Sequence, residues 1–258
     1  MKFHFLTDNL GGIIMSIYED LTPGDFAKTT KKRLPICFCL DTSGSMMAPT
    51  ESGKTRMEEL NNAFSKFINA MKDNDEVASS ADIAIVTFGG NAEILKPFGP
   101  LSNQNDIEIK VKKRSLTPMG EAIQIALKLL EVRKGGYKDK GLKYFQPWLV
   151  VLTDGEPEGE NAIENMTKAI AEATALEQDN KLVIFNIGIG EDANLDVLKK
   201  LSIKREKPIS VGETNLDELF TFLGSSSESV VSGGDTDVLY GKEQMPKGKE
   251  IDISEWCV

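Results

Sequence analysis

Four short apolar runs divide this sequence, and most of them are separated by segments with helical spacing of apolar residues. The runs cover residues 36–40, 81–88, 148–153 and 181–187. Each is followed by a glycine or an aspartate and is too short for a buried helix, which is typical of a buried strand. Strands that alternate with helices favour a largely parallel sheet with helices on both faces. The sequence therefore predicts an α/β fold.

Apolar residues recur every three or four positions between the runs, which predicts amphipathic helices that pack on the sheet. Residues 162–176 form a further, alanine-rich helical segment, and 195–201 a short one. The periodic positions of the three remaining segments are Met57, Leu60, Phe64, Phe67, Ile68 and Met71, then Ile123, Leu127 and Leu130, then Leu216, Leu219, Phe220 and Leu223.

The second apolar run is followed by turn residues, Gly89-Gly90-Asn91, and by another extended segment, 92–98. This pattern predicts a β-hairpin. Pro97 cannot donate a ladder hydrogen bond, so the second strand of the hairpin is expected at an edge of the sheet. Residues 208–211 are expected to form a last edge strand.

Three other segments receive local predictions. Thr117 and Pro118 resemble the N-cap and first residue of the helix that follows. Residues 133–147 are basic and contain glycine, so we expect an exposed loop. The clusters Lys31-Lys32-Arg33 and Lys112-Lys113-Arg114 are expected on solvated faces.

A polar cluster follows the first apolar run directly. It reads Asp41-Thr42-Ser43-Gly44-Ser45. In open α/β sheets, ligands bind at the carboxyl ends of the strands, where this cluster is predicted to lie. One carboxylate and two hydroxyls on a tight loop form a set of hard oxygen donors that suits an ion such as Mg²⁺.

This cluster resembles the metal-ion-dependent adhesion site of von Willebrand factor A (VWA) domains. The resemblance covers residues 33 to 223 and implies two more ligands, a threonine and an aspartate. Thr117, before a predicted helix, and Asp154, after a predicted strand, match them in order and position. It also implies a three-layer Rossmann-like fold, with a mostly parallel sheet, one antiparallel edge strand and helices on both faces.

The resemblance further implies a function. In this family Ser43, Ser45 and Thr117 would touch the cation, whereas Asp41 and Asp154 would often act through water. The solvent side is left for an Asp or Glu of a protein partner. We therefore expect a Mg²⁺-dependent adaptor or scaffold, with Mn²⁺ or Ca²⁺ as alternative cations and without catalysis of its own.

Residues 33–46 and 152–157 are most similar to the TerY-like bacterial VWA proteins. Those proteins are intracellular and are associated with tellurite resistance, stress or phage defence, often beside a kinase and a phosphatase. The resemblance implies a cytoplasmic protein with such a partner. The N-terminal extension and the acidic tail depart from that pattern.

Two enzyme classes are alternatives. A haloacid-dehalogenase-type phosphotransferase needs a second aspartate two residues after the first, and Ser43 occupies that position. A nucleotide-binding enzyme could use Gly188-Ile-Gly190 with Ala193, but Glu191 and Asp192 would repel a pyrophosphate. In a third hypothesis the C-terminal tail, and not the cation, recruits the partner.

Composition limits the partners and the compartment. A net charge of −10 and a pI near 4.8 argue against nucleic acid and anionic membranes as the main partner. The three cysteines suggest no disulfide framework, and Cys37 and Cys39 are expected to be buried apolar residues. No apolar stretch reaches the roughly 20 residues that a membrane span requires. The N-terminus does not resemble a signal peptide.

Three regions are predicted along the chain. Residues 1–32 form an N-terminal extension that contains His4, for which no catalytic role is expected. Residues 33–223 form the α/β domain. Residues 224–258 are rich in serine, glycine and acids and are predicted to be a flexible linker and an acidic tail.

Overall fold

The computed structural model describes residues 30–104, 107–112, 115–190, 193–205 and 207–234. These ranges do not include most of the predicted N-terminal extension, which contains His4. They also do not include the tail from residue 235, which contains Cys257.

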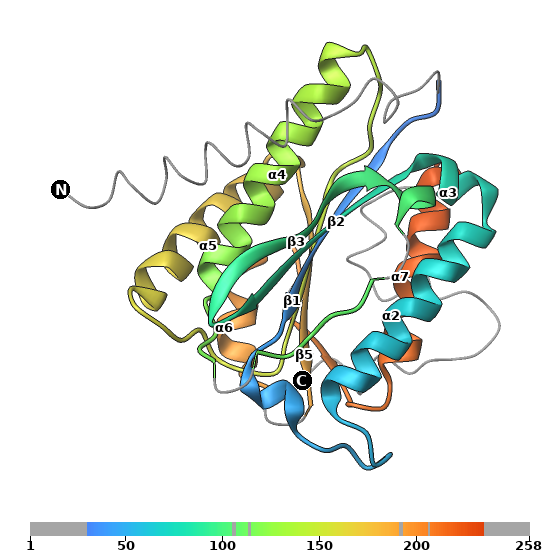
Figure 1. Ribbon diagram of the computed structural model, residues 1–258. Helices are drawn as coiled ribbons and strands as arrows, with labels where there is room; N and C mark the ends of the chain where they lie inside the picture. Colours follow the sequence, from blue (N-terminus) through green and yellow to red (C-terminus); the bar gives the residue numbers. More distant parts are fainter. Residues whose placement is uncertain (1–29, 105–106, 113–114, 191–192, 206, 235–258) are drawn as a thin grey trace.

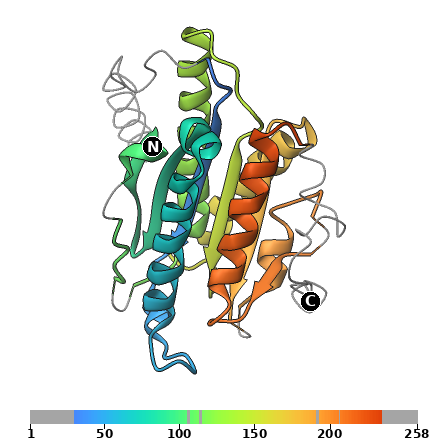
Figure 2. The same ribbon diagram turned by 90° about the vertical axis from the view of Figure 1, so that its right-hand side faces the viewer.

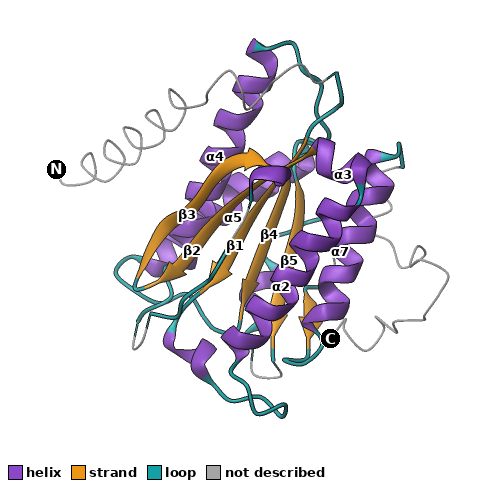
Figure 3. Cartoon of the chain, turned by 45° about the vertical axis from the view of Figure 1, so that its right-hand side comes forward, coloured by secondary structure: helices purple, strands orange, loops and turns teal. Residues whose placement is uncertain are grey.

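One six-stranded sheet forms the middle layer, in the order β3-β2-β1-β4-β5-β6 (Figures 1 and 3). All neighbouring strands are parallel except β2 and β3, which form the predicted antiparallel hairpin. The prediction of a mostly parallel sheet with one antiparallel edge strand is confirmed. The strands are β1 (Leu34–Asp41), β2 (Ala81–Gly89), β3 (Asn91–Pro100), β4 (Trp148–Thr153), β5 (Val183–Ile189) and β6 (Ile209–Val211).

Helices cover both faces of the sheet, which confirms the three-layer arrangement. Helices α2 and α7 lie side by side on one face (Figure 2), and α4 and α5 pack together on the other (Figure 1). Each face of the sheet has its own cluster of buried apolar side chains. Side chains along β1 point alternately to the two faces and so contribute to both clusters. The helices are α2 (Arg56–Asp73), α3 (Asp75–Ser80), α4 (Met119–Asp139), α5 (Ala162–Gln178), α6 (Leu195–Lys199) and α7 (Leu216–Val231), with 3-10 turns at η2 (Gly44–Met47) and η3 (Leu101–Asn103).

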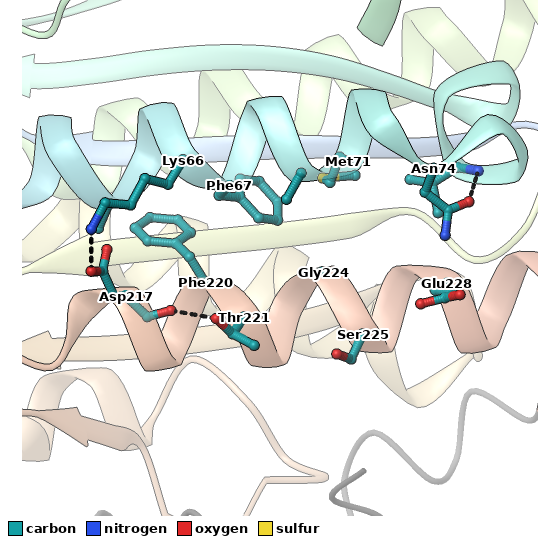
Figure 4. Close-up of a pocket in the computed structure, with 13 residues that line it drawn as sticks. Lys66, Phe67, Met71, Asn74, Asp217, Phe220, Thr221, Gly224, Ser225 and Glu228 are labelled. Atoms are coloured by element: carbon teal, nitrogen blue, oxygen red, sulfur yellow. Dashed lines mark hydrogen bonds and ion pairs between the residues drawn. The ribbon is translucent and has the colours of Figure 1, made fainter. Parts of the chain in front are cut away.

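Aromatic side chains join α2 and α7 to the sheet. The ring centroids of Phe38 and Phe64 lie 5.1 Å apart, and those of Phe67 and Phe220 lie 5.2 Å apart. Between the two helices runs a groove of about 380 Å³, which Phe67, Met71 and Phe220 help to line (Figure 4). The apolar side chains predicted along one face of α2 are buried and form part of the hydrophobic core.

Helix α4 differs from its prediction at both ends. Pro118 is the N-cap residue and the helix begins at Met119, so Thr117 does not cap it. The helix also continues to Asp139, through much of the segment predicted as a loop. The basic composition suggested exposure, but Arg133 and Tyr137 are buried and their polar groups donate hydrogen bonds to a carboxylate of the sheet.

That carboxylate belongs to Asp82, near the start of β2. Asp82 is fully buried and accepts hydrogen bonds from the side chains of Arg33, Arg133 and Tyr137. The prediction that Arg33 lies on a solvated face is therefore wrong. Its charge can be buried because an opposite charge is buried beside it.

Helix α7 runs past Gly224 to Val231, where the sequence suggested a flexible linker. The serines of this segment were misleading because Ser226, Ser227 and Val230 face the core and are buried. Gly233 follows the C-cap residue Ser232, and its φ of 95° suits glycine.

Within the described residues, no helix is both long and apolar enough to cross a membrane.

Candidate functional site

The polar cluster lies at the carboxyl edge of the sheet, in the loop after β1. Asp41 is the last residue of the strand, and residues Gly44–Met47 form the short 3-10 turn η2. The loop packs closely on the end of β2. A Cβ atom on Gly89 would lie only 2.6 Å from the Thr42 carbonyl oxygen, so the close approach requires glycine there.

Asp41 is held by hydrogen bonds on both carboxylate oxygens. Its Oδ1 accepts from the backbone N–H of Ser43 at 2.8 Å, and its Oδ2 accepts from the Thr153 hydroxyl at 2.6 Å. The sheet register explains the second contact. Leu40 pairs with Leu152, so the residues that follow, Asp41 and Thr153, emerge side by side. The aspartate is fully buried.

The two serines continue this network to Asp154. The Oγ atoms of Ser43 and Ser45 lie 2.8 Å apart, and the Ser45 hydroxyl donates to Asp154 Oδ1 at 2.7 Å. Asp154 follows β4 and is buried, whereas Ser45 is exposed. The fold therefore brings together four of the five residues predicted for the site, from two loops that are more than 100 positions apart in the sequence.

Thr117, the fifth residue, reaches the same edge through its backbone. Its carbonyl oxygen accepts from the N–H of Glu158 at 2.9 Å, which fastens its loop to the loop of Asp154. The threonine is buried, and within the described residues its hydroxyl makes no hydrogen bond. The side chain is thus not used as the helix cap that the sequence suggested.

Three further residues belong to the network and were not predicted from the sequence. Thr153 orients Asp41, and Arg56 donates from Nη1 to Asp154 Oδ2 at 2.9 Å. Arg56 also donates from Nε to Glu213 at 2.6 Å. Arg56 is the first residue of α2, where the helix dipole disfavours a positive charge. That position is the one signal in the sequence that could have marked it.

The sequence profile of the von Willebrand factor type A domain matches residues 36–222. The chain belongs to the VWA family. Domains of this family are typically adhesion or interaction modules, and the matched region contains all five predicted site residues.

Solved structures share the VWA fold at low sequence identity. The VWA domain of the type V pilus tip protein Mfa5 from Porphyromonas gingivalis aligns with a TM-score of 0.58 at 11% identity, over 80% of this chain and 99% of that chain. A VWA protein from Catenulispora acidiphila aligns with a TM-score of 0.52 at 18% identity, over 76% of this chain and 43% of that chain. Proximal thread matrix protein 1 from the mussel byssus aligns with a TM-score of 0.51 at 17% identity, over 77% and 47%. The present chain thus spans less than half the length of the last two, and these likenesses concern the fold.

The donor set of this VWA domain fits a small divalent cation. Ligand oxygens at the 2.0–2.1 Å that Mg²⁺ prefers lie roughly 3 Å apart when they are neighbours in an octahedron. The two consecutive spacings from Ser43 Oγ through Ser45 Oγ to Asp154 Oδ1, 2.8 and 2.7 Å, are close to that value. The described residues contain no cluster of three or more His, Cys, Asp or Glu placed for a metal, so any cation here depends on the hydroxyls.

Burial raises the pKa of Asp41 from its ordinary value of 3.8 to about 6. The hydrogen bonds from Thr153 and Ser43 lower the pKa, and the nearby charge of Asp154 raises it further. Desolvation is the largest of these effects because the carboxylate is removed from water and no cation in direct contact compensates it. A group in this state favours either a proton or a metal ion.

The raised pKa of Asp41 predicts a pH dependence for the chelated protein. Between about pH 4 and pH 6 the unfolded chain has lost the Asp41 proton while the folded state still holds it, so stability falls as the pH rises. We expect the free energy of unfolding of the wild type, relative to Asp41→Asn, to fall by on the order of 2 to 3 kcal/mol from about pH 4 to pH 7. Urea unfolding of both proteins in EDTA measures it, and a constant difference would contradict it.

Two other groups of residues lie at this edge, the acids after Asp154 and the glycines at the end of β5. Glu156, Glu158 and Glu160 are exposed, as predicted for an acidic rim. A Cβ atom on Gly188 would lie 2.7 Å from the Leu195 side chain. This glycine therefore allows α6 to pack on β5, a structural role that needs no nucleotide.

Proposed function

We propose that this VWA domain binds a divalent cation, with Mg²⁺ as the first candidate, and through it a carboxylate of a protein partner. Asp41, Ser43, Ser45, Thr117 and Asp154 would hold the ion. The observation that carries the proposal is the hydrogen-bonded network from Asp41 through Ser43 and Ser45 to Asp154, since its carboxylate and hydroxyl oxygens are hard donors and Ser45 is open to solvent.

The charges around the site favour an anionic partner. Two carboxylates face the site, and Arg56 already neutralises part of the charge of Asp154. A divalent cation there would be incompletely neutralised by protein groups and would attract an Asp or Glu side chain. The bound cation would supply positive charge and open coordination positions for the partner's carboxylate. The residues of this chain would hold the cation in place at the edge of the sheet.

The resemblance to TerY-like proteins supports a bacterial stress, tellurite-resistance or phage-defence role in the cytoplasm, with a kinase or phosphatase as a candidate partner. A pull-down from the native host, with and without chelator, tests this part. We expect the partner to be retained only with the cation, and the same proteins retained under both conditions would contradict the proposal.

The enzyme alternative has less support at this site. The Ser43 hydroxyl stands where a phosphotransferase needs its second carboxyl group, and it contacts Ser45. Hydrolysis of a generic aryl phosphate, in the presence of Mg²⁺, would favour the alternative if the Asp41→Ala variant abolished it.

Cation binding is tested by thermal unfolding. At a Mg²⁺ concentration about 100 times its Kd, ligand linkage stabilises the folded state by about 2.7 kcal/mol, which corresponds to a Tm increase of roughly 5 °C or more. We expect Asp41→Ala to remove this increase and the exposed-site control Asp179→Ala to keep it. A wild-type Tm that does not respond to Mg²⁺, Mn²⁺ or Ca²⁺ would refute the proposed function.

A further inference from the structure

Exposed large apolar side chains are concentrated around the candidate cation site. Among the described residues there are four, with exposed fractions of 42% for Met47, 51% for Leu116, 86% for Ile163 and 54% for Ile203. Isolated exposed apolar residues are ordinary, but a group of them beside one site marks an interaction surface.

Two of the four lie on loops that carry predicted ligands, and a third lies at the start of the helix that follows such a loop. Met47 ends the turn η2, two residues after Ser45, and Leu116 directly precedes Thr117. Ile163 lies in the first turn of α5, which follows the loop of Asp154. Ile203 lies at the opposite edge of the sheet, because its N–H donates to Glu177 near the other end of α5.

A hollow of about 240 Å³ adjoins this apolar group. Leu116 and Pro118, which flank Thr117 in sequence, form part of its wall, and Glu121, Glu158 and Glu160 line its polar side. No lysine or arginine among the described residues pairs with these three carboxylates. The hollow is smaller than the roughly 300–1,000 Å³ of typical small-molecule sites, so it suits a single side chain.

The shape and charge of this surface specify a kind of side chain. Lysine and arginine place an apolar stem against apolar surface and keep a charged head at a polar rim. The wall and rim of the hollow provide those two environments, and positive charge is complementary to three carboxylates and to the net charge of −10.

We propose that the partner segment carries, close to the carboxylate that binds the cation, a lysine or arginine that enters this hollow and an apolar side chain that covers Leu116 and Ile163. This inference rests on the proposed function, since the cation fixes the carboxylate beside Thr117. The partner is therefore a protein segment in which an Asp or Glu stands close to a Lys or Arg and to a large apolar residue.

The experiment is selection of random heptapeptides displayed on phage against the immobilised full-length protein in Mg²⁺. We expect enriched peptides to contain Asp or Glu together with Lys or Arg and a large apolar residue, and chelator to release them. Acidic residues enriched without basic and apolar neighbours would overturn the inference while leaving the proposed function standing. Chelator-insensitive binding, or no enrichment, would overturn both.

Matched variants locate the surface, with one enriched peptide as the synthetic probe. We expect Glu158→Lys and Ile163→Ser each to weaken its binding about tenfold. The controls Glu218→Lys on α7 and Ile203→Ser at the opposite edge should leave binding unchanged. If a control weakens binding as much as its counterpart, the proposed surface is wrong.

Discussion

Replacement of Asp82 by asparagine is expected to lower the free energy of unfolding by about 3 to 5 kcal/mol. Asp82 is fully buried and accepts hydrogen bonds from Arg133 Nη2 at 2.9 Å, from Arg33 Nε at 3.2 Å and from the Tyr137 hydroxyl. The amide that replaces the carboxylate carries no charge, so two buried guanidinium groups lose their counter-ion. Leaving such charges uncompensated is one of the most destabilising single changes in a protein interior.

Urea unfolding of the wild type and Asp82→Asn measures this loss. A matched control is Asp179→Asn, because Asp179 pairs with Lys181 and both side chains are 59% exposed. That surface pair is expected to contribute less than about 1 kcal/mol. Equal effects of the two substitutions would show that the buried cluster does not hold β1, β2 and α4 together.

Replacement of Arg56 by glutamine is expected to cost about 3 kcal/mol in chelator and to increase the stabilisation that Mg²⁺ provides. Arg56 is the cation that compensates Asp154, whose side chain is fully buried, and it also contacts Glu213, whose side chain is 22% exposed. Without the guanidinium, Asp154 retains the Ser45 hydroxyl as its hydrogen-bond donor. A divalent cation would then relieve a larger electrostatic cost than it does in the wild type.

The measurement compares the Mg²⁺-induced change in Tm of Arg56→Gln with that of the wild type. Lys54→Gln is the control, because Lys54 is half exposed and pairs with Glu59 at 3.5 Å, away from Asp154. We expect Lys54→Gln to respond to Mg²⁺ as the wild type does. An identical Mg²⁺ response in Arg56→Gln would mean that Arg56 and the cation do not share the Asp154 charge.

Three of the residues proposed to bind the cation, Asp41, Ser43 and Ser45, could be predicted from a local pattern, whereas Thr117 and Asp154 were assigned to the site from the family resemblance. Asp41 and Asp154 come directly after apolar runs, and parallel strands bring their carboxyl ends to one edge. Ser43 and Ser45 follow from the spacing of the first loop. The assignment of Thr117 to the site depended on the family resemblance, because its local pattern predicts a helix N-cap. The structure shows no such cap.

Other sequence predictions failed where composition and tertiary contacts disagreed. Basic residues at 133–139 and serines at 225–227 suggested loops, yet both segments are helical. Composition reports the average solvent exposure of a residue type, whereas a particular Arg133 or Ser227 is buried when another element supplies its partner.

The sequence by itself determined the α/β class, the order of strands and helices, the hairpin at the edge and the positions at which polar residues leave the sheet. These depend on local periodicity and on turn residues, which neighbouring positions encode. The tertiary structure alone decided that Arg33 and Arg133 meet at Asp82, and that Arg56 reaches Asp154 and Glu213. A buried charge is stable only beside a partner that is distant in the sequence, and no local pattern specifies which partner that is.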